Sequence, residues 1–298
     1  MSLTALYEVA APAKLNLFLH VIGRREDGYH LLQSVFVLID WADTLHFERR
    51  GDGKLARHDL GPALPADDLC LRAARLLQTE SGITLGADIS IDKRVPWGAG
   101  MGGGSSDAAS TLLALNRLWG LHWPRERLAA LGLKLGADVP FFIGGRNAFV
   151  EGIGERLTPL PVPPAWLAVL KPAASIETRA IFGSPLLVRD TEAVILAGFL
   201  ADTAGSVRRV LDGFGRNDLQ PPAEAHCADV VTALEILQRR FGNARMTGSG
   251  SAVFARAGNI GTEGAEPTAA MPADLPPGWV GRMCRSLEQH PLVGWAPD

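Results

Sequence analysis

One stretch rich in glycine and serine, residues 96–107, has the composition of a loop that binds phosphate groups. It reads PWGAGMGGGSSD. Glycine has no Cβ, so its backbone can adopt a positive φ and approach a ligand closely. The two serines open a run of good helix formers, which predicts a helix that begins at Ser105 or Ser106. Because a helix N-terminus offers free amides and partial positive charge, the stretch predicts a phosphate cradle.

Other interpretations of this stretch are weaker. A flexible linker is polar and unstructured, whereas this stretch lies between a strand-like run, residues 87–95, and an amphipathic helix. No Lys-Ser or Lys-Thr follows the glycines, which argues against a P-loop. The G-x-G-x-x-G pattern fits Gly98, Gly100 and Gly103, but it lies far from a βαβ start, which disfavours a Rossmann site.

Two charged residues outside this stretch could carry proton or charge chemistry. Lys14 shares one face of a predicted strand with Asn16, just after the turn Ala-Pro-Ala at residues 11–13. An isolated lysine of this kind is either a solvated surface residue or an ammonium held in one place. Asp138 lies between a glycine-containing turn and the apolar run 139–143, where a carboxylate needs a partner. It is either a local turn or N-cap acceptor or a catalytic base in a partly dehydrated site.

An aromatic pair follows a hairpin turn that Asp27-Gly28 predicts. Tyr29 and His30 are either packing residues at a strand edge, or a flat ring and a hydrogen-bonding group for a nucleobase. Further along the chain, Thr178 and Phe182 share i, i+4 spacing on a short helix or turn that we predict over residues 175–182.

The elements that must position these residues are a mixture of strands and helices. The pattern predicts strands over residues 7–23, two strands within 31–49 broken near 40–43, and strands over 87–95, 165–170, 252–257 and 279–287, with a hairpin over 148–160. It predicts a helix that Asp67 or Asp68 caps and that runs to about residue 78, a helix from 105 or 106 to a cap at Gly120, and helices over 124–133, 191–200, 207–214 and 226–241. Residues 258–278 are expected to form a surface loop. A proline cluster at residues 159–164 indicates a boundary between two domains, residues 1–160 and 161–298.

The bulk composition excludes several classes of protein. The 298 residues are 47% hydrophobic and 20% charged, which is ordinary for a globular chain. A net charge of −3 gives no general attraction to nucleic acid or an anionic membrane, so we expect neither as a partner. Three separated cysteines indicate no disulfide framework and no metal site. With no signal peptide and no long apolar run, we expect a soluble, cytoplasmic protein.

Three separated motifs together resemble the GHMP kinases, the family of galactokinase, homoserine kinase and mevalonate kinase. They are AKLNLFL at 13–19, the stretch at 96–107 and MTGSGSAVFA at 246–255, and the motifs DGYH at 27–30 and LGADVP at 135–140 join them. The resemblance covers about residues 7–257. It implies an α+β fold of two domains, with mixed or antiparallel sheets, helices packed on them, a ferredoxin-like second domain and a catalytic cleft between the two.

The resemblance also implies roles for individual residues. Lys14 and Asp138 match the catalytic pair. The ATP loop matches Pro96, Trp97, Gly98, Ala99, Gly100, Met101, Gly102, Gly103, Gly104, Ser105 and Ser106. The substrate side matches Asn16, Tyr29, His30, Thr178 and Phe182, with the cytosine ring held between Tyr29 and Phe182. Thr247 and Gly248 match a turn that closes the cleft near the phosphates. The chain departs from the familiar loop at Ala99, which must not need a positive φ, and at Met101.

The implied reaction is transfer of the γ-phosphoryl group of ATP, with Mg²⁺, to a small alcohol that carries a cytidine diphosphate. Asp138 is expected to accept the hydroxyl proton, and the hydroxyl of Ser106 is a possible Mg²⁺ ligand. We expect a monomer or a weak homodimer. Two alternatives stay open: a GHMP kinase for another alcohol, such as mevalonate or homoserine, and a nucleotide sensor that binds ATP without turnover.

Overall fold

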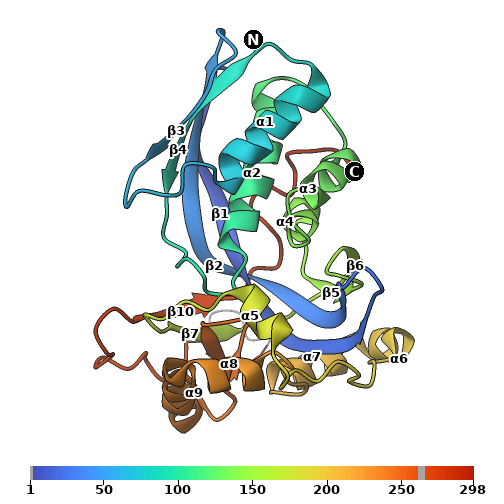
Figure 1. Ribbon diagram of the computed structural model, residues 1–298, viewed down its shortest axis with the longest axis vertical. Helices are drawn as coiled ribbons and strands as arrows, with labels where there is room; N and C mark the ends of the chain where they lie inside the picture. Colours follow the sequence, from blue (N-terminus) through green and yellow to red (C-terminus); the bar gives the residue numbers. More distant parts are fainter. Residues whose placement is uncertain (1–2, 261–265) are drawn as a thin grey trace.

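Two β-sheets, each covered by helices, build the molecule (Figure 1). The computed structural model describes residues 3–260 and 266–298. The first sheet and its helices form an upper lobe, and the second sheet and its helices form a lower lobe (Figure 1). The α+β class and the mixed and antiparallel sheets predicted from the sequence are confirmed.

The upper sheet is built around two long strands that pair antiparallel over most of their length. Its strands are β1 (Ala5–Arg24), β2 (His30–Arg50), β3 (Leu55–Asp59), β4 (Gly86–Asp92), β5 (Ala148–Glu151) and β6 (Arg156–Pro159). Strand order is β3-β4-β2-β5-β6 with β1 paired to β2, and only β3 and β4 run parallel. The helices of this lobe are α1 (Leu69–Ser81), α2 (Gly103–Leu118), α3 (Arg125–Leu133) and α4 (Val139–Gly144).

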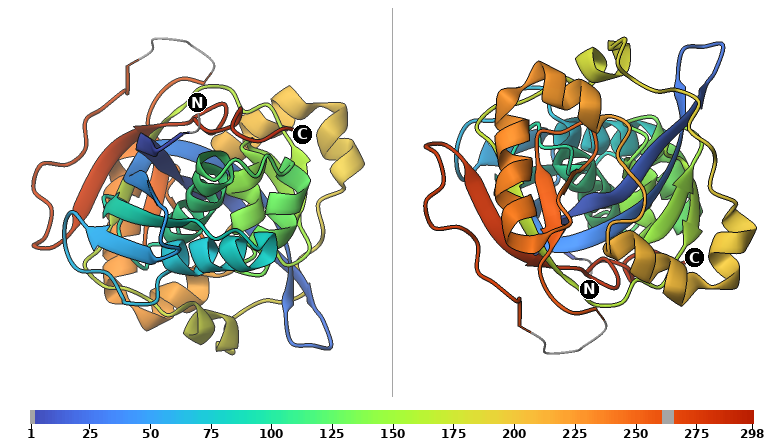
Figure 2. Two further views of the ribbon diagram at one scale, coloured as in Figure 1. Left: turned by 90° about the horizontal axis from the view of Figure 1, so that it is seen from above. Right: turned by 90° about the horizontal axis from the view of Figure 1, so that it is seen from below.

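The lower sheet is antiparallel, in the order β10-β7-β9-β8. Its strands are β7 (Trp166–Lys171), β8 (Arg245–Met246), β9 (Val253–Arg256) and β10 (Val280–Arg285). The helices of this lobe are α5 (Thr178–Gly183), α6 (Leu196–Ala201), α7 (Thr203–Leu211), α8 (Gln220–His226) and α9 (Ala228–Phe241). Helices α8 and α9 cover the outer face of this sheet (Figure 2).

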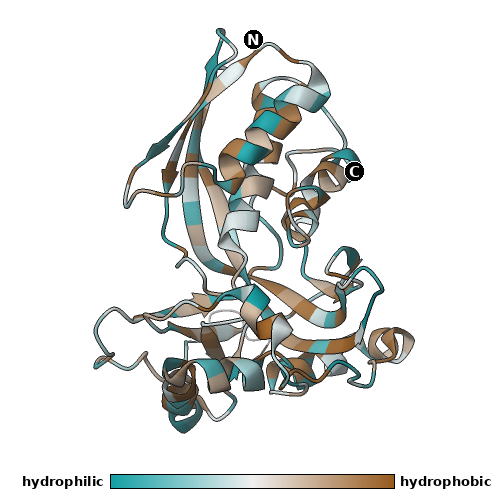
Figure 3. Ribbon diagram, viewed as in Figure 1, coloured by the Kyte–Doolittle hydropathy of each residue, from teal (hydrophilic) through white to brown (hydrophobic). Residues whose placement is uncertain are grey.

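Apolar residues fill three spaces, of which the lower core lies between the lower sheet and helices α8 and α9. One core lies between the upper sheet and its helices, and hydrophobic residues mark the strands and the helix faces there (Figure 3). A second core joins the lobes, because Leu15 of β1 and Val37 of β2 pack in one cluster with Leu167 of β7 and Phe254 of β9. The lobes therefore share buried surface, and the site between them is held from both sides.

The predicted break near residues 40–43 is wrong, since β2 is one continuous strand. The polar residues that suggested a break are attachment points. Asp40 Oδ1 accepts the backbone N–H of Arg285 at 2.9 Å, and Asp43 is fully buried in contacts described below. A polar pair in an apolar strand therefore indicated tertiary contacts and not a turn.

Three helix predictions need correction at their ends. Helix α2 begins at Gly103, two residues before Ser105, because Gly102 turns the chain in the left-handed region and Gly103 and Gly104 take helical geometry. Helix α6 begins at Leu196, which is later than predicted. Helix α7 begins at Thr203, which is earlier than predicted. Helix α8 was missed, because its two prolines lie in its first turn, where proline is tolerated.

The chain after β10 returns to the upper lobe. Leu292 and Ala296 are buried in the upper core, and the backbone N–H of Arg125 donates to Pro297 O at 2.7 Å. The Arg125 side chain also donates to the carbonyls of Ala296 and Ile143, the latter in α4. The division into residues 1–160 and 161–298 stays a prediction, and this packing adds the end of the chain to the first unit.

Part of the predicted loop at 258–278 falls on residues 261–265, which lie outside the described residues. In the part of it that the structure describes, Met271 and Leu275 pack against the lower core. No helix within residues 3–260 or 266–298 combines the length and the apolar character needed to cross a bilayer.

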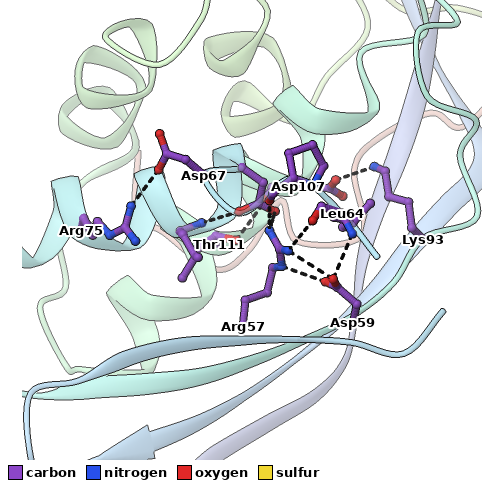
Figure 4. Close-up of polar contacts among 11 residues, drawn as sticks. Arg57, Asp59, Leu64, Asp67, Arg75, Lys93, Asp107 and Thr111 are labelled. Carbon is purple, nitrogen blue, oxygen red and sulfur yellow. Dashed lines mark hydrogen bonds and ion pairs between the residues drawn. The ribbon is translucent and has the colours of Figure 1, made fainter. Parts of the chain in front are cut away.

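A buried ionic cluster closes the base of the glycine loop. Lys93 precedes the loop, and its ammonium contacts Asp43. It also contacts Asp107, which lies on α2 just after the loop (Figure 4). Asp43 Oδ1 also accepts the backbone N–H groups of Arg94 and Val95 at 2.6 and 2.7 Å. The cluster therefore ties the start of the loop to β2 and joins it to the helix that follows.

The two carboxylates of this cluster differ. Asp43 accepts hydrogen bonds through both oxygens, whereas Asp107 Oδ1 is buried without a hydrogen-bond partner among the described residues. Burial raises the pKa of Asp107 well above its usual range, Lys93 lowers it, and the neighbouring Asp43 raises it further. Folding therefore favours the protonated form of Asp107 relative to the unfolded chain, whereas Asp43 contacts Lys93 and accepts two backbone N–H groups.

A second ionic network, centred on Arg57 of β3, holds the segment before α1 in place. Arg57 of β3 pairs with Asp59 at 2.8 Å and with Asp68 at 3.1 Å, and it donates to the carbonyls of Leu64 and Pro65 (Figure 4). Asp68 in turn caps α1 through the N–H of Leu71 at 3.0 Å, which confirms the predicted start of that helix.

The difference between Asp43 and Asp107 predicts opposite effects of two matched substitutions. Asp43→Asn leaves a buried lysine without its charge partner, so we expect a loss of about 3–5 kcal/mol of unfolding free energy. An acid whose pKa is raised by folding costs stability once the pH exceeds its value in the unfolded chain. Asp107→Asn should therefore match or exceed the wild type in stability, with a gain that grows as pH rises from 5 to 8. Denaturant unfolding at both pH values measures this, and equal destabilisation by the two variants would contradict the assignment.

Candidate active site

Lys14 lies on β1 with its ammonium buried among polar atoms. Its Nζ donates to Asn16 Oδ1 at 2.6 Å and to Gly100 O at 3.3 Å, and it lies 4.5 Å from the centre of the Phe36 ring. Only 3% of the residue is exposed. The alternative of a solvated surface lysine therefore does not describe Lys14, which is held in one place as a fixed positive charge.

Asp138 faces this lysine. It occupies the N-cap position of α4, yet its side chain makes no capping hydrogen bond. Its Oδ2 instead lies 3.5 Å from Lys14 Nζ, and 30% of the side chain is exposed. The sequence left two roles open for this carboxylate. It does not cap the helix, and it faces Lys14 and the cavity instead.

Asn16 connects the lysine to the lower lobe. Its backbone N–H donates to Thr247 Oγ1 at 2.9 Å, and its Nδ2 donates to Ser34 Oγ at 3.1 Å. Thr247 Oγ1 also lies 3.2 Å from Asn16 Oδ1, which already accepts from Lys14. The polar atoms of the Asn16 side chain are thus engaged by protein groups, and Thr247 connects the late glycine turn to Asn16, which in turn contacts Lys14.

The glycine loop turns through three positive φ angles. Gly98, Gly100 and Gly102 have φ of 62°, 71° and 69°. Ala99 is not among the residues with positive φ, as the sequence required, and Ala99 and Met101 point into the core between the lobes. The loop therefore alternates buried side chains with glycines, and its glycine backbone is what faces the site.

The loop crosses the late turn backbone against backbone. A Cβ added to Gly100 would lie 2.4 Å from Thr247 O, and a Cβ added to Gly248 would lie 2.6 Å from Gly100 O. A Cβ at Gly102 would lie 3.2 Å from Lys14 Cε and 3.0 Å from the Phe142 ring. Side chains at these positions would separate the lobes or displace the lysine.

The end of the loop is the N-terminus of α2. Ser105 is half-buried there, whereas the Ser106 hydroxyl is buried and donates to Pro12 O at 2.7 Å. Ser106 thus fastens α2 to β1 through its O–H group, and its role as a Mg²⁺ ligand stays a prediction. At the other end, Pro96 is half-buried and Trp97 is 62% exposed beside the loop.

The predicted base-binding residues line the far part of the same site. The rings of His30 and Phe182 lie 4.9 Å apart at 32°, and Tyr29 is 60% exposed. Thr178 Oγ1 lies 2.8 Å from Ser249 Oγ in the late turn. Burial lowers the pKa of His30, and the charges of Arg189 and Arg24 lower it further. Phe182 contacts His30 in this structure, and the sandwich of a base between Tyr29 and Phe182 stays a prediction.

One cavity of about 1130 Å³ contains these groups. Residues of the upper lobe that line it include Lys14, Asn16, Tyr29, His30, Gly100, Gly102 and Asp138, and those of the lower lobe include Thr178, Phe182 and Ser249. The catalytic pair, the centre of the glycine loop and the aromatic residues therefore open on the same space between the lobes.

Several residues that shape this site were missed at the sequence level. Ser34 and Phe36 lie in an ordinary strand pattern, and no local signal distinguishes them from core residues. Gly154 lies at φ 120°, and a Cβ there would be 3.8 Å from Asp138 Oδ1. Its position in a hairpin turn explained the glycine without reference to Asp138, so only the structure connects the two.

Family models match both halves of the chain. Residues 68–146 match the GHMP kinases N terminal domain, and residues 195–264 match the GHMP kinases C terminal model. The 4-diphosphocytidyl-2-C-methyl-D-erythritol kinase of Methylibium petroleiphilum is 70% identical, covering 99% of this chain and 100% of that protein. The protein of the same name from Variovorax paradoxus is 56% identical, with 98% and 99% covered.

Solved structures give the same result. A crystal structure of 4-(cytidine 5'-diphospho)-2C-methyl-D-erythritol kinase matches with a TM-score of 0.70 at 36% identity, covering 85% of this chain and 90% of that one. The homoserine kinase of Cytophaga hutchinsonii matches with a TM-score of 0.66 at 14% identity, over 96% of this chain and 95% of that one, and this likeness concerns the fold alone. By its fold, its site and its full-length relatives, the chain belongs to the 4-diphosphocytidyl-2-C-methyl-D-erythritol kinases of the GHMP kinase family.

Proposed function

We propose that this chain transfers the γ-phosphoryl group of ATP to the 2-hydroxyl of 4-diphosphocytidyl-2-C-methyl-D-erythritol, a step of the non-mevalonate route to isoprenoid precursors. The observation that supports this most is the single cavity that holds the Lys14–Asp138 pair, the glycine loop and the aromatic residues. A kinase needs its acceptor hydroxyl beside the base and the γ-phosphate, and a long substrate needs an anchor for its far end.

Asp138 is proposed to accept the proton of the acceptor hydroxyl. Its carboxylate is partly exposed in the cavity and has no capping role. Lys14 provides a fixed positive charge 3.5 Å away, which favours the ionised carboxylate and can stabilise negative charge on the transferred group. Because Lys14 is held by Asn16 and Gly100 O, it cannot follow the substrate and keeps its place between base and phosphate loop.

The loop and the start of α2 are proposed to hold the phosphates of ATP. The first amides of α2 have no partner within the helix, and the glycines leave the backbone open to an anion. Trp97 and Pro96 lie at the outer end of the loop, whereas Ala99, Met101 and Ser106 support the loop from the core. The ATP loop predicted over residues 96–106 thus divides into residues that can face a phosphate and residues that hold the loop in shape.

Mg²⁺ is proposed to bind at this site together with ATP, mainly through the phosphates. No group of three or more His, Cys, Asp or Glu among the described residues could hold a metal ion, and the Ser106 O–H donates to Pro12 O. Mg²⁺ keeps phosphate and water as most of its ligands, so a protein cage is not needed. When bound, it neutralises charge on the phosphates. Asp138 is the carboxylate of the catalytic pair and could bind one of its waters.

The aromatic residues are proposed to hold the cytosine ring. Tyr29 and Phe182 supply flat faces, and stacking on such rings is worth roughly 1–3 kcal/mol per base. His30 supplies ring and backbone groups at the base edge. The alternatives, a kinase for mevalonate or homoserine or a nucleotide sensor, need no base pocket beside the catalytic pair.

The substrate prediction is tested with purified protein in a coupled assay for ADP release. We expect turnover with 4-diphosphocytidyl-2-C-methyl-D-erythritol and none with mevalonate or homoserine, because only the first fills the aromatic end of the cavity. Tyr29→Ala should raise its KM without changing the KM for ATP. Turnover with another alcohol would overturn the cytidine pocket, and ATP binding without any turnover would favour the sensor.

The base assignment is tested by Asp138→Ala. We expect kcat to fall by about 10²–10⁴ while ATP affinity, measured by calorimetry, stays near wild type. Asp202→Ala is the matched control, because Asp202 is an N-cap that does bond its helix, at 3.0 Å to the Gly205 N–H. That variant should lose about 1 kcal/mol of stability and keep its kcat. An active Asp138→Ala enzyme would refute the assignment.

The crossing of the loop and the late turn is tested by Gly100→Ala. A Cβ there meets Thr247 O and needs a φ that alanine avoids, so we expect ATP affinity to fall at least ten-fold and the protein to lose about 1–3 kcal/mol of stability. Gly198→Ala, in α6 with nothing within 4 Å of an added Cβ, should be neutral or stabilising. Unchanged ATP affinity in Gly100→Ala would remove the loop from the nucleotide site.

A further inference from the structure

We propose that Arg189, which does not line the cavity, is a positioning residue for the base pocket: it fixes His30 of β2 and the end of α5 relative to each other, and it leaves His30 Nδ1 as a donor for the bound base. The inference rests on the proposed function for the identity of the base.

Arg189 joins the two walls of the pocket through four hydrogen bonds. Its Nε donates to His30 Nε2 at 3.2 Å, its Nη2 donates to Phe182 O at 2.9 Å and Ser184 O at 3.0 Å, and its Nη1 donates to Leu187 O at 3.0 Å. His30 belongs to the upper sheet, and Phe182 lies on α5 of the lower lobe. One guanidinium therefore sets the distance between a histidine and an aromatic ring that both line the cavity.

The arginine also completes a short helix. Helix α5 has six residues, Thr178–Gly183, and the carbonyls at its end have no partner within the helix. Arg189 reaches back to two carbonyls in this region, Phe182 O and Ser184 O, as a cationic cap at a helix C-terminus does. Since Phe182 is the last residue but one of α5, the cap holds the ring that would stack on the base.

The hydrogen bond to His30 determines where the histidine carries its proton. A guanidinium can only donate, so His30 Nε2 must be the acceptor and must be unprotonated. The neutral ring then carries its hydrogen on Nδ1, which has no hydrogen-bond partner among the described residues. Cytosine offers a carbonyl oxygen and a ring nitrogen as acceptors, so an Nδ1–H donor in the pocket wall suits its edge.

Charge supports the same assignment. Besides burial, the groups that lower the pKa of His30 are Arg189 and Arg24, which lies opposite His30 on β1. Arg189 forms no ion pair with a carboxylate among the described residues, and its four acceptors are neutral. Protonation of His30 would remove the acceptor and place two cations together. Binding of the base should therefore weaken as pH falls through the pKa of His30.

The first test is Arg189→Met, which keeps an unbranched stem as far as the position of Nε and removes the donors and the charge. We expect the KM for 4-diphosphocytidyl-2-C-methyl-D-erythritol to rise about 10- to 100-fold and the KM for ATP to stay unchanged. Arg189→Lys keeps the charge but cannot make four hydrogen bonds, so its KM for this substrate should lie between those of the wild type and of Arg189→Met. Arg239→Met is the control, because Arg239 lies exposed on α9 with an ion pair only to Glu235.

The second test separates positioning from a general loss of structure. The pKa of His30 is measured by NMR in the ligand-free protein, with His30→Gln to assign the signal. We expect this pKa to rise in Arg189→Met and to stay near wild type in Arg189→Lys, and the pH at which KM begins to increase should rise with it. An unchanged His30 pKa in Arg189→Met, or equal increases in both KM values, would overturn the proposal. The titration needs no substrate, so it stands apart from a failure of the proposed function.

Discussion

The contact on which the site depends is the crossing of two glycine backbones, Gly100 of the loop and Gly248 of the late turn. There is no room for a side chain between them. Because the loop backbone and the turn backbone touch, Gly100 O can also accept from Lys14, and Thr247 can reach Asn16. The glycine loop, Lys14 and the lower lobe therefore share one fixed point, and a change at any of them reaches the others.

Near this crossing, Lys14 and Arg189 are each held in place by several hydrogen bonds. Lys14 has one nearby carboxylate and otherwise neutral partners, and Arg189 has only neutral acceptors. The ionic cluster of Lys93, Asp43 and Asp107 lies behind the loop and balances itself. Under the proposed function, a chain with net charge −3 would hold its anionic substrates by local attraction from the amides at the start of α2 and from cations that line the cavity, Lys14, Arg24 and Arg179.

Much of this site could be predicted from the sequence because its central parts are local motifs. The glycine loop, the turn before Tyr29 and the strand that carries Lys14 each combine a backbone requirement with a chemical one inside about ten residues. The residues that were missed act across long distances in the sequence. The segment with Asp43 was interpreted as a break between two strands, because the partners of Asp43 lie some fifty residues away in the sequence. Arg189 lies in an irregular segment with no periodic pattern. Glycines in the first turn of α2 were interpreted as loop residues, and α8 was not predicted because its prolines, which a first turn tolerates, hid the helix.

The return of the C-terminal residues to the upper lobe has a consequence for biosynthesis. A ribosome releases this chain from its N-terminus onward, so the motifs of the upper lobe emerge early. The core behind α4, which begins next to Asp138, also contains Leu292 and Ala296. The upper lobe therefore cannot complete its packing as an autonomous nascent domain. Its last core residues are synthesised only after the whole lower lobe, so the upper lobe should complete its packing once the lower lobe has emerged and not before.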